Sequence, residues 1–125
     1  MKNTVIVADD SELIRNIMIK ALNDEYNVIT AKDGREAIEA IRINQDNNLA
    51  CVLLDLKMPT YDGFTVLEYL KNYKLHKKIP VFIISGDDSK ETIEKAFNYD
   101  VIDMLNKPFS IDKIKDAVKR AINLK

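Results

Sequence analysis

The chain has 125 residues, of which 46% are apolar and 31% charged, and its formal net charge is −1. This composition suits one folded domain and excludes an intrinsically disordered chain. The balanced charge excludes a strong global field toward nucleic acid or an anionic membrane, and no apolar run approaches the ~18 residues of a membrane span. A single cysteine, Cys51, cannot form a disulfide within the chain, and the first residues lack a signal-peptide cleavage pattern. We therefore expect one domain over residues 1–125, located in the cytoplasm.

Strand and helix patterns alternate from the N-terminus. An apolar run over residues 5–8 predicts a strand, and residues 12–23 carry apolar side chains at helical spacing. Residues 27–31 form a weaker apolar run. Asp33 and Glu36 then have the spacing of a capping box, in which two side chains bind backbone N–H groups at the start of a helix. The first part of the chain is therefore predicted to be strand, helix, strand, helix.

The second part continues the alternation. Three further strands are predicted from apolar runs at residues 51–54, 81–84 and 101–105. The helices after them are predicted to begin at Asp62–Gly63, at a second candidate capping box of Asp88 and Glu91, and at Ser110. Strict alternation predicts a (βα)₅ α/β fold, with a parallel sheet, right-handed crossovers and helices on both faces. Runs that are apolar throughout indicate buried strands, so the weaker second run and the fifth run, interrupted by Asp103, are expected at the sheet edges.

Polar residues follow four of the five predicted strands. Asp9 and Asp10 come after the first strand and Asp55 after the third. Ser85 follows the fourth strand, and Lys107 follows the fifth. Open parallel sheets bind ligands beyond the carboxyl ends of their strands. If the first, third, fourth and fifth strands are neighbours, these five side chains meet at one edge of the sheet.

The chemistry of these five groups is coherent. Three carboxylates in one pocket repel one another and raise one another's pKa unless a cation shares the site. Mg²⁺ binds carboxylate and phosphate oxygens, and a lysine supplies a positive charge for an anion. Such a set suits phosphoryl transfer, where the protein positions groups and neutralises charge, and an aspartate can be the covalent acceptor.

Five segments carry a resemblance to a known family: Val-Ala-Asp-Asp-Ser at 7–11, Leu-Leu-Asp-Leu-Lys-Met-Pro at 53–59, Asp-Gly at 62–63, Ile-Ile-Ser-Gly at 83–86 and Asn-Lys-Pro-Phe at 106–109. From Val5 to about Ile122 the chain resembles the receiver domains of two-component response regulators, and in layout the chemotaxis response regulator. The resemblance implies a doubly wound, flavodoxin-like five-stranded sheet with strand order 2-1-3-4-5. It also implies a phosphorylation-dependent signalling switch that is not a turnover enzyme on an external substrate.

The resemblance also implies roles for the acidic residues. Asp55 is expected to be the phosphoacceptor. Asp10 is expected to bind Mg²⁺ (or Mn²⁺) directly, Asp9 to bind it largely through water, and Asp55 and the backbone carbonyl of Lys57 to be further ligands.

Other implied roles concern the phosphoryl group. Ser85 and Lys107 are expected to bind it, and the Lys107–Pro108 peptide bond is expected to be cis, a state found almost only before proline. Lys57 and Asp87 occupy the positions that tune dephosphorylation in the family and are able to pair across the pocket mouth.

The implied partners are signalling proteins. The phosphodonor is expected to be a sensor histidine kinase, a phosphotransfer protein or a small acyl phosphate. A downstream effector or an output domain of the same protein is expected to contact the face formed by the fourth helix, fifth strand and fifth helix. Neither direct nucleic-acid binding by this domain nor a membrane interaction is expected.

The sequence departs from the family pattern at two places. Met104 stands three residues before the lysine, where the family usually has Tyr or Phe; it can fill the space but offers no ring. Asp100–Val101 replaces the usual Gly-Ala, and we expect Asp100 to adopt the same left-handed turn. His76 is predicted to be a solvated loop residue, and Cys51 a core side chain.

Other interpretations are possible for the same residues. Asp9 and Asp10 could simply cap the following helix. A pseudo-receiver that only binds partners would usually lack one of the five pocket groups. A phosphohydrolase of the haloacid-dehalogenase type would carry an acid at the position of Lys57, and a flavodoxin would not place Asp9-Asp10-Ser11 beside a phosphate.

Overall fold

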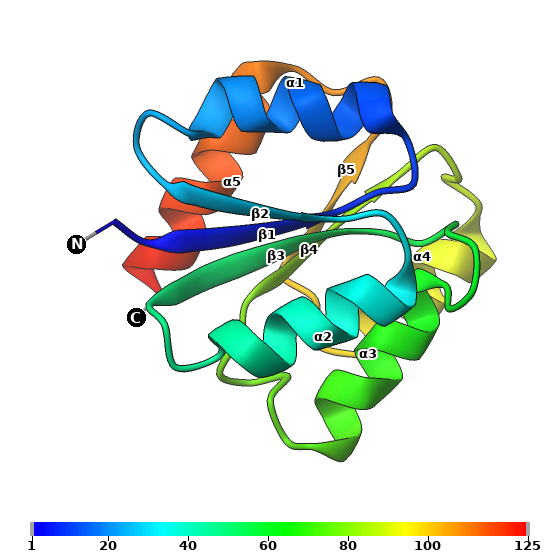
Figure 1. The fold of residues 1–125 in the computed structure, drawn as a ribbon. Coiled ribbons are helices and arrows are strands. Elements are labelled where there is room, and N and C mark those ends of the chain that lie inside the picture. The colour runs from blue at the N-terminus through cyan, green and yellow to red at the C-terminus, as the bar shows by residue number, and fades with distance from the viewer. Residues whose placement is uncertain (1, 125) are drawn as a thin grey trace.

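In the computed structural model, which describes residues 2–124, strands and helices alternate from the N-terminus as predicted (Figure 1). The strands of the described residues are β1 (Thr4–Ala8), β2 (Asn27–Ala31), β3 (Leu49–Asp55), β4 (Val81–Ser85) and β5 (Asp103–Asn106). The helices are α1 (Glu12–Leu22), α2 (Gly34–Asn44), α3 (Gly63–Asn72), α4 (Lys90–Phe97) and α5 (Ile111–Asn123). The predicted domain bounds, Met1 and Lys125, lie outside the described residues.

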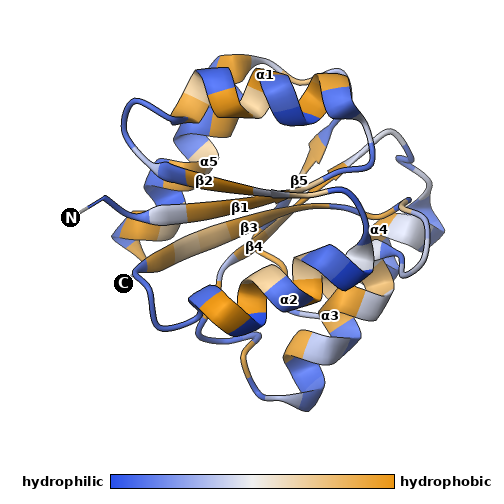
Figure 2. Ribbon diagram, viewed as in Figure 1, coloured by the Kyte–Doolittle hydropathy of each residue, from blue (hydrophilic) through white to orange (hydrophobic). Residues whose placement is uncertain are grey.

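All five strands pair in parallel, in the order β2-β1-β3-β4-β5. This confirms the predicted fold and strand order, including the placement of the two weaker runs at the edges. The central strands β1, β3 and β4 are buried along their whole length because helices cover both of their faces. Their strongly apolar composition is visible in Figure 2, where the helices instead show alternating apolar and polar bands.

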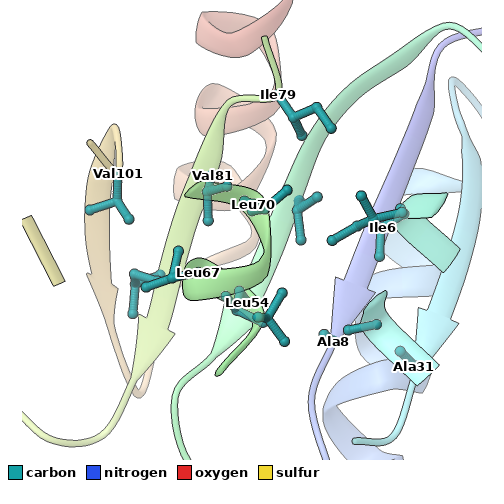
Figure 3. Packing of buried hydrophobic residues seen from close by; sticks show 14 of the residues in the cluster. Ile6, Ala8, Ala31, Leu54, Leu67, Leu70, Ile79, Val81 and Val101 are labelled. Atoms are coloured by element: carbon teal, nitrogen blue, oxygen red, sulfur yellow. The ribbon is translucent and has the colours of Figure 1, made fainter. Parts of the chain in front are cut away.

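Two hydrophobic clusters lie on opposite faces of the sheet. Alternate residues of each strand point to alternate faces, so Ile6 joins one cluster while its neighbours Val5 and Val7 join the other. The first cluster packs under α2, α3 and α4, and Figure 3 shows Leu67 and Leu70 of α3 lying over this face of the sheet. The second cluster packs under α1 and α5. Cys51 is wholly buried in β3, as predicted.

The fifth strand differs from its prediction. Val101 and Ile102 precede it, and pairing with β4 begins where Asp103 lies opposite Phe82. Val101 is buried against the first cluster, which explains its apolar character without a strand. Asp103 is therefore the first residue of the strand, and its carboxylate accepts a hydrogen bond of 3.0 Å from Arg120 on α5.

Two helix starts also differ from prediction. The N-cap of α4 is Ser89, whose hydroxyl accepts the N–H of Thr92, so the predicted box of Asp88 and Glu91 is wrong. At α2, Asp33 accepts the N–H of Glu36 as predicted. The Glu36 carboxylate, however, accepts the N–H of Lys32 rather than that of Asp33. At α4, Asp88 and Ser89 are neighbours and either side chain could cap the helix, so small differences in the backbone decide which one does.

His76 is less solvated than predicted. Its side chain is 22% exposed, with Nε2 at 3.7 Å from Asp100 Oδ2, and its Nδ1 is buried without a hydrogen-bond partner. Asp100 adopts the expected left-handed conformation, with φ of 61°. That turn brings the Asp100 carboxylate to His76. No helix in the described part of the chain has the length and apolarity to cross a membrane.

Candidate functional site

The predicted polar residues lie at the carboxyl ends of adjacent strands. Asp9 follows β1, Asp55 ends β3, Ser85 ends β4 and Lys107 follows β5. Because these strands pair in parallel as neighbours, their carboxyl ends meet at one edge of the sheet. Asp55, Asp9 and Ser85 are buried there, with exposed fractions of 5%, 0% and 2%.

Three carboxylates gather at this edge. Asp9, Asp10 and Asp55 each offer one oxygen, and these oxygens lie within 4.8 Å of one another. Asp9 and Asp10 are not the cap of α1, because the Ser11 hydroxyl accepts the N–H of Ile14 and fills that position. Asp9 Oδ1 instead accepts the N–H of Ser11, at 2.9 Å. The alternative interpretation of the aspartate pair as a simple helix cap is therefore wrong.

Lys107 is the counterion of this cluster. Its Nζ lies 2.8 Å from Asp9 Oδ2 and 3.3 Å from Asp55 Oδ2. Both contacts are ion pairs, and the ammonium also donates a hydrogen bond to Asp55 Oδ2. The backbone N–H of Lys107 donates to the Ser85 carbonyl at 2.8 Å, and the Lys107–Pro108 peptide bond is cis, as the resemblance implied.

The electrostatics of the pocket favour an added cation. Burial, and then the negative charge of Asp9, raise the pKa of Asp55 to about 6, although Lys107 partly offsets them. Burial alone would lower the pKa of Lys107, but its contacts with Asp9 and Asp55 raise it above its ordinary value. One ammonium faces three carboxylates, so the pocket carries excess negative charge. A divalent cation bound to carboxylate oxygens would relieve it.

The loop after β3 is shaped by a close backbone approach. Gly63 begins α3, and its N–H donates to the Leu56 carbonyl at 2.9 Å. A Cβ atom on Gly63 would lie 2.5 Å from the Asp55 carbonyl oxygen and 2.7 Å from the Leu56 Cα. Only glycine fits here without a backbone shift, which explains the Asp-Gly pair that opens this helix. The start of α3 thus fixes the backbone that carries Asp55.

Lys57 and Asp87 do not form the pair that their positions allowed. No ion pair between them is found among residues 2–124. The N–H of Lys57 donates to Asp55 Oδ1 at 3.3 Å. The carboxylate of Asp87 accepts hydrogen bonds from the Ser89 N–H and the Thr92 hydroxyl, both at 2.9 Å, and these bonds lower the pKa of Asp87. Asp87 is therefore hydrogen-bonded to the start of α4, and the charge of Lys57 adds a smaller contribution to its lowered pKa.

Met104 lies outside the pocket. It pairs with Ile83 in the sheet and packs, partly buried, against the cluster under α2, α3 and α4. Ser85 lies between Met104 and Asp55 in strand order, but its hydroxyl bonds the backbone of Asp87 and neither Asp55 nor Lys107. Of the predicted phosphoryl-binding groups, the structure therefore brings Lys107 to Asp55 and leaves the Ser85 hydroxyl turned away.

Sequence reasoning missed Arg15. This residue lies on the first turns of α1, and its guanidinium donates a 2.8 Å hydrogen bond back to the backbone carbonyl of Asp9. The Asp9 N–H donates to the Ala31 carbonyl, so the Asp9 backbone is held from both sides. The signal was available, because an arginine five residues after Asp10 on a helix that starts at Glu12 can reach back over the loop.

The comparisons with known proteins agree with this geometry. The family model for the response regulator receiver domain matches residues 5–119. Response regulator RR06 of Streptococcus pneumoniae is 36% identical over 119 residues, which are 94% of this chain and 52% of RR06. The chain spans about half, or less, of the length of the curated relatives it matches.

Solved structures show the same fold over nearly the whole chain. The receiver domain of the Francisella response regulator 1452 has a TM-score of 0.86 and 30% identity, with 98% of each chain covered. A chain of the CheX–CheY–BeF₃–Mg²⁺ complex from Borrelia burgdorferi has a TM-score of 0.84 and 25% identity, covering 94% of this chain and 87% of that one. Strand order, carboxylate cluster and family match agree, and the chain belongs to the response regulator receiver domain family.

Proposed function

We propose that Asp55 accepts a phosphoryl group in a Mg²⁺-dependent reaction and that this modification switches the contacts of the domain. Receiver domains of response regulators are phosphorylation-dependent signalling modules rather than turnover enzymes, and phosphorylation of an aspartate with Mg²⁺ is standard in the family. The observation that carries the proposal for this chain is the carboxylate cluster of Asp9, Asp10 and Asp55 with Lys107 bridging two of its members.

The donor set fits a hard cation. Carboxylate oxygens are the ligands that Mg²⁺ prefers, and the same ligands would accept Mn²⁺. Asp9, Asp10, Asp55 and the Lys57 carbonyl would hold the ion. When bound, Mg²⁺ would neutralise negative charge on the carboxylates and on the phosphoryl oxygens.

The chain's own residues then have distinct tasks. A carboxylate oxygen of Asp55 attacks the phosphorus atom and forms an O–P bond. The P–N bond of a phosphohistidine, or the P–O bond of an acyl phosphate, breaks, and the leaving group keeps the electron pair. The Lys107 ammonium, already 3.3 Å from Asp55, stabilises negative charge on the transferred group. Asp55 must be ionised to attack; its raised pKa of about 6 lies below neutral pH, and a bound cation would favour the ionised form further.

We propose that the donor is a sensor histidine kinase, a phosphotransfer protein or a small acyl phosphate. The switched surface is the face of α4, β5 and α5, which would contact an effector or an output domain of the same protein. A hollow between β5 and α5 supports the β5–α5 part of this proposal; it is lined by Asp103, Met104, Leu105, Lys113, Asp116, Ala117 and Arg120. The greater length of relatives named as transcriptional regulatory proteins also supports it.

The test is intact-protein mass spectrometry after incubation with acetyl phosphate, with and without Mg²⁺. We expect one added phosphoryl group that depends on Mg²⁺ and is lost in Asp55→Ala. Asp46→Ala is the matched control, because Asp46 is an exposed aspartate at the opposite end of the sheet. Absence of the adduct in the wild type, and of beryllofluoride binding, would favour a phosphorylation-independent pseudo-receiver that acts only by contacts.

A further inference from the structure

Positive charge gathers in the loop from α3 to β4, at the amino end of the strands and opposite the candidate functional site. No Asp or Glu occurs from residue 69 to residue 86, whereas this stretch holds Lys71, Lys74, Lys77 and Lys78. The whole chain has a net charge of −1, so the rest of it carries −5 once these four positive charges are set aside. All four lysines are exposed, and none forms an ion pair within residues 2–124. We call these four residues the basic patch.

The end of α3 explains only part of the basic patch. The dipole of a helix favours positive side chains in its last turn, which accounts for Lys71 but does not reach the last two lysines. Lys74 has a φ of 57°, and the N–H of Leu75 donates to the Leu70 carbonyl at 2.8 Å, as in a Schellman motif. Glycine is the usual residue at this left-handed position. The chain therefore keeps a lysine charge here at a cost in backbone strain.

A hollow opens beside the last lysine of the patch. It measures about 340 Å³ and lies between the α2–β3 loop and the α3–β4 loop. Buried aliphatic side chains form its floor and exposed polar ones its rim: Leu49, Leu75 and Ile79, and Gln45, Asp46, Asn48 and Lys78. The rim amides can donate to and accept from a peptide backbone. Such a hollow can take up one aliphatic side chain while its rim binds the backbone beside it.

Two large apolar side chains are exposed near the patch and the hollow. Tyr73, between two lysines of the patch, is 66% exposed, and its ring packs on that of Tyr69 with 4.8 Å between the centroids. Ile43, two residues before Gln45 of the hollow, is 62% exposed. Exposed apolar side chains together with unpaired positive charge are typical of a surface that binds another protein.

We propose that the basic patch and the hollow bind an acidic segment of a partner protein. An apolar side chain of this segment enters the hollow, and carboxylates on either side of it pair with the lysines. The lining of the hollow favours a protein segment over a nucleic acid, because it is aliphatic, whereas bases bind by stacking on aromatic rings. The charge of −5 on the rest of the chain would also repel a long polyanion. Since this surface lies away from Asp55, the inference goes beyond the proposed function and does not depend on it.

The test follows the fluorescence anisotropy of a labelled peptide in which three glutamates flank a central leucine on each side. The triple variant Lys74→Gln, Lys77→Gln, Lys78→Gln should bind this peptide about tenfold more weakly than the wild type, since each exposed ion pair contributes modestly. A second peptide, with glycine in place of the leucine, should bind the wild type about fivefold more weakly than the first, because it leaves the hollow empty.

The matched control joins Lys20→Gln, Lys32→Gln and Arg35→Gln, which removes the same amount of charge from exposed positions on α1 and near the start of α2. This control should bind the leucine peptide like the wild type. The single variant Lys74→Gly separates binding from folding, because glycine relieves the left-handed strain. It should unfold at a higher urea concentration than the wild type and still bind the peptide about twofold more weakly.

Absence of peptide binding by the wild type, or equal affinities of the two triple variants, would overturn the inference. Equal binding of the leucine and glycine peptides would also overturn it, because the hollow would then take no part. A labelled single strand of poly-dT is titrated in parallel. If it bound more tightly than the leucine peptide and with the same dependence on the basic patch, the partner would be a nucleic acid and the inference would be wrong.

Discussion

The two sides of the pocket are held in different ways. On the β1 side, Asp9 is wholly buried, and its backbone and side chain are fixed by Ala31, Ser11, Arg15 and Lys107. On the β4 side, the buried Ser85 is hydrogen-bonded to the loop that follows it, and the residues of that loop are partly or fully exposed. Buried charges with several partners resist displacement, whereas exposed hydrogen bonds exchange readily with water. The acidic side of the pocket is therefore held by more buried contacts than the β4–α4 side.

Removal of Lys107, the counterion of the buried aspartates, is expected to cause the largest loss of stability. Lys107→Met leaves Asp9 and Asp55 buried without a positive partner, and removal of one member of such a group costs about 4 kcal/mol of unfolding free energy. Urea unfolding without Mg²⁺ measures this loss, and added Mg²⁺ should recover most of it. Lys119→Met, an exposed lysine of α5, is the control. Equal stability of the two variants would contradict the assignment of Lys107 as counterion.

The charge of Asp55 gives the second-largest effect. Its folded-state pKa of about 6 exceeds the ordinary value of 3.8, so folding takes up a proton between these pH values. Without Mg²⁺, the free energy of unfolding should therefore fall as pH rises through this window, by at most about 3 kcal/mol. Asp55→Asn should flatten this fall and be the more stable protein at pH 7, and Mg²⁺ should flatten it in the wild type. If the unfolding free energy of Asp55→Asn fell with pH as in the metal-free wild type, ionisation of Asp55 would not be the cause of the fall.

Gly63, near Asp55, and Gly86, in the β4–α4 loop, allow the packing of the two sides of the pocket to be compared directly. An alanine at Gly63 would press on the backbone of Asp55 and Leu56, so Gly63→Ala should lower the free energy of unfolding by about 2 kcal/mol. A Cβ atom at Gly86, in the β4–α4 loop, has no neighbour within 4 Å, and Gly86→Ala should be nearly neutral. Chemical denaturation of both variants measures the contrast. Similar losses in the two would mean that the β4 side is packed as tightly as the acidic side.

Arg15 gives the smallest expected effect. Arg15→Gln loses the 2.8 Å bond to the Asp9 carbonyl and should weaken Mg²⁺ binding about tenfold, as loss of a supporting contact around a metal site typically does. Isothermal titration calorimetry with Mg²⁺ measures the change. Arg35→Gln, an exposed arginine on the first turn of α2, is the matched control. If both variants bind Mg²⁺ like the wild type, Arg15 does not position the acidic pair.

The fold was predictable because hydrophobic patterns report burial, and burial decides how strands and helices pack. Runs such as residues 51–54 and 81–84 identified the central strands, and the residues after them identified the acidic edge. The details that failed depend on competition between near-equal local contacts. Ser89 rather than Asp88 caps α4, and Asp87 turns to Thr92 rather than Lys57. Pattern alone cannot decide such contacts, because the alternatives differ by about one hydrogen bond.

The position of β5 at the edge of the sheet also affects whether the domain associates with itself at high concentration. A sheet edge exposes unpaired N–H and C=O groups, on which a strand of another molecule can add itself. β5 is an edge strand of only four residues, and it begins with Asp103, whose partner Arg120 places a second charge beside it. Short length and flanking charge are ways in which natural edges discourage such addition. The face that we propose for signalling can therefore be exposed to a partner while strand pairing between two copies of the domain is disfavoured.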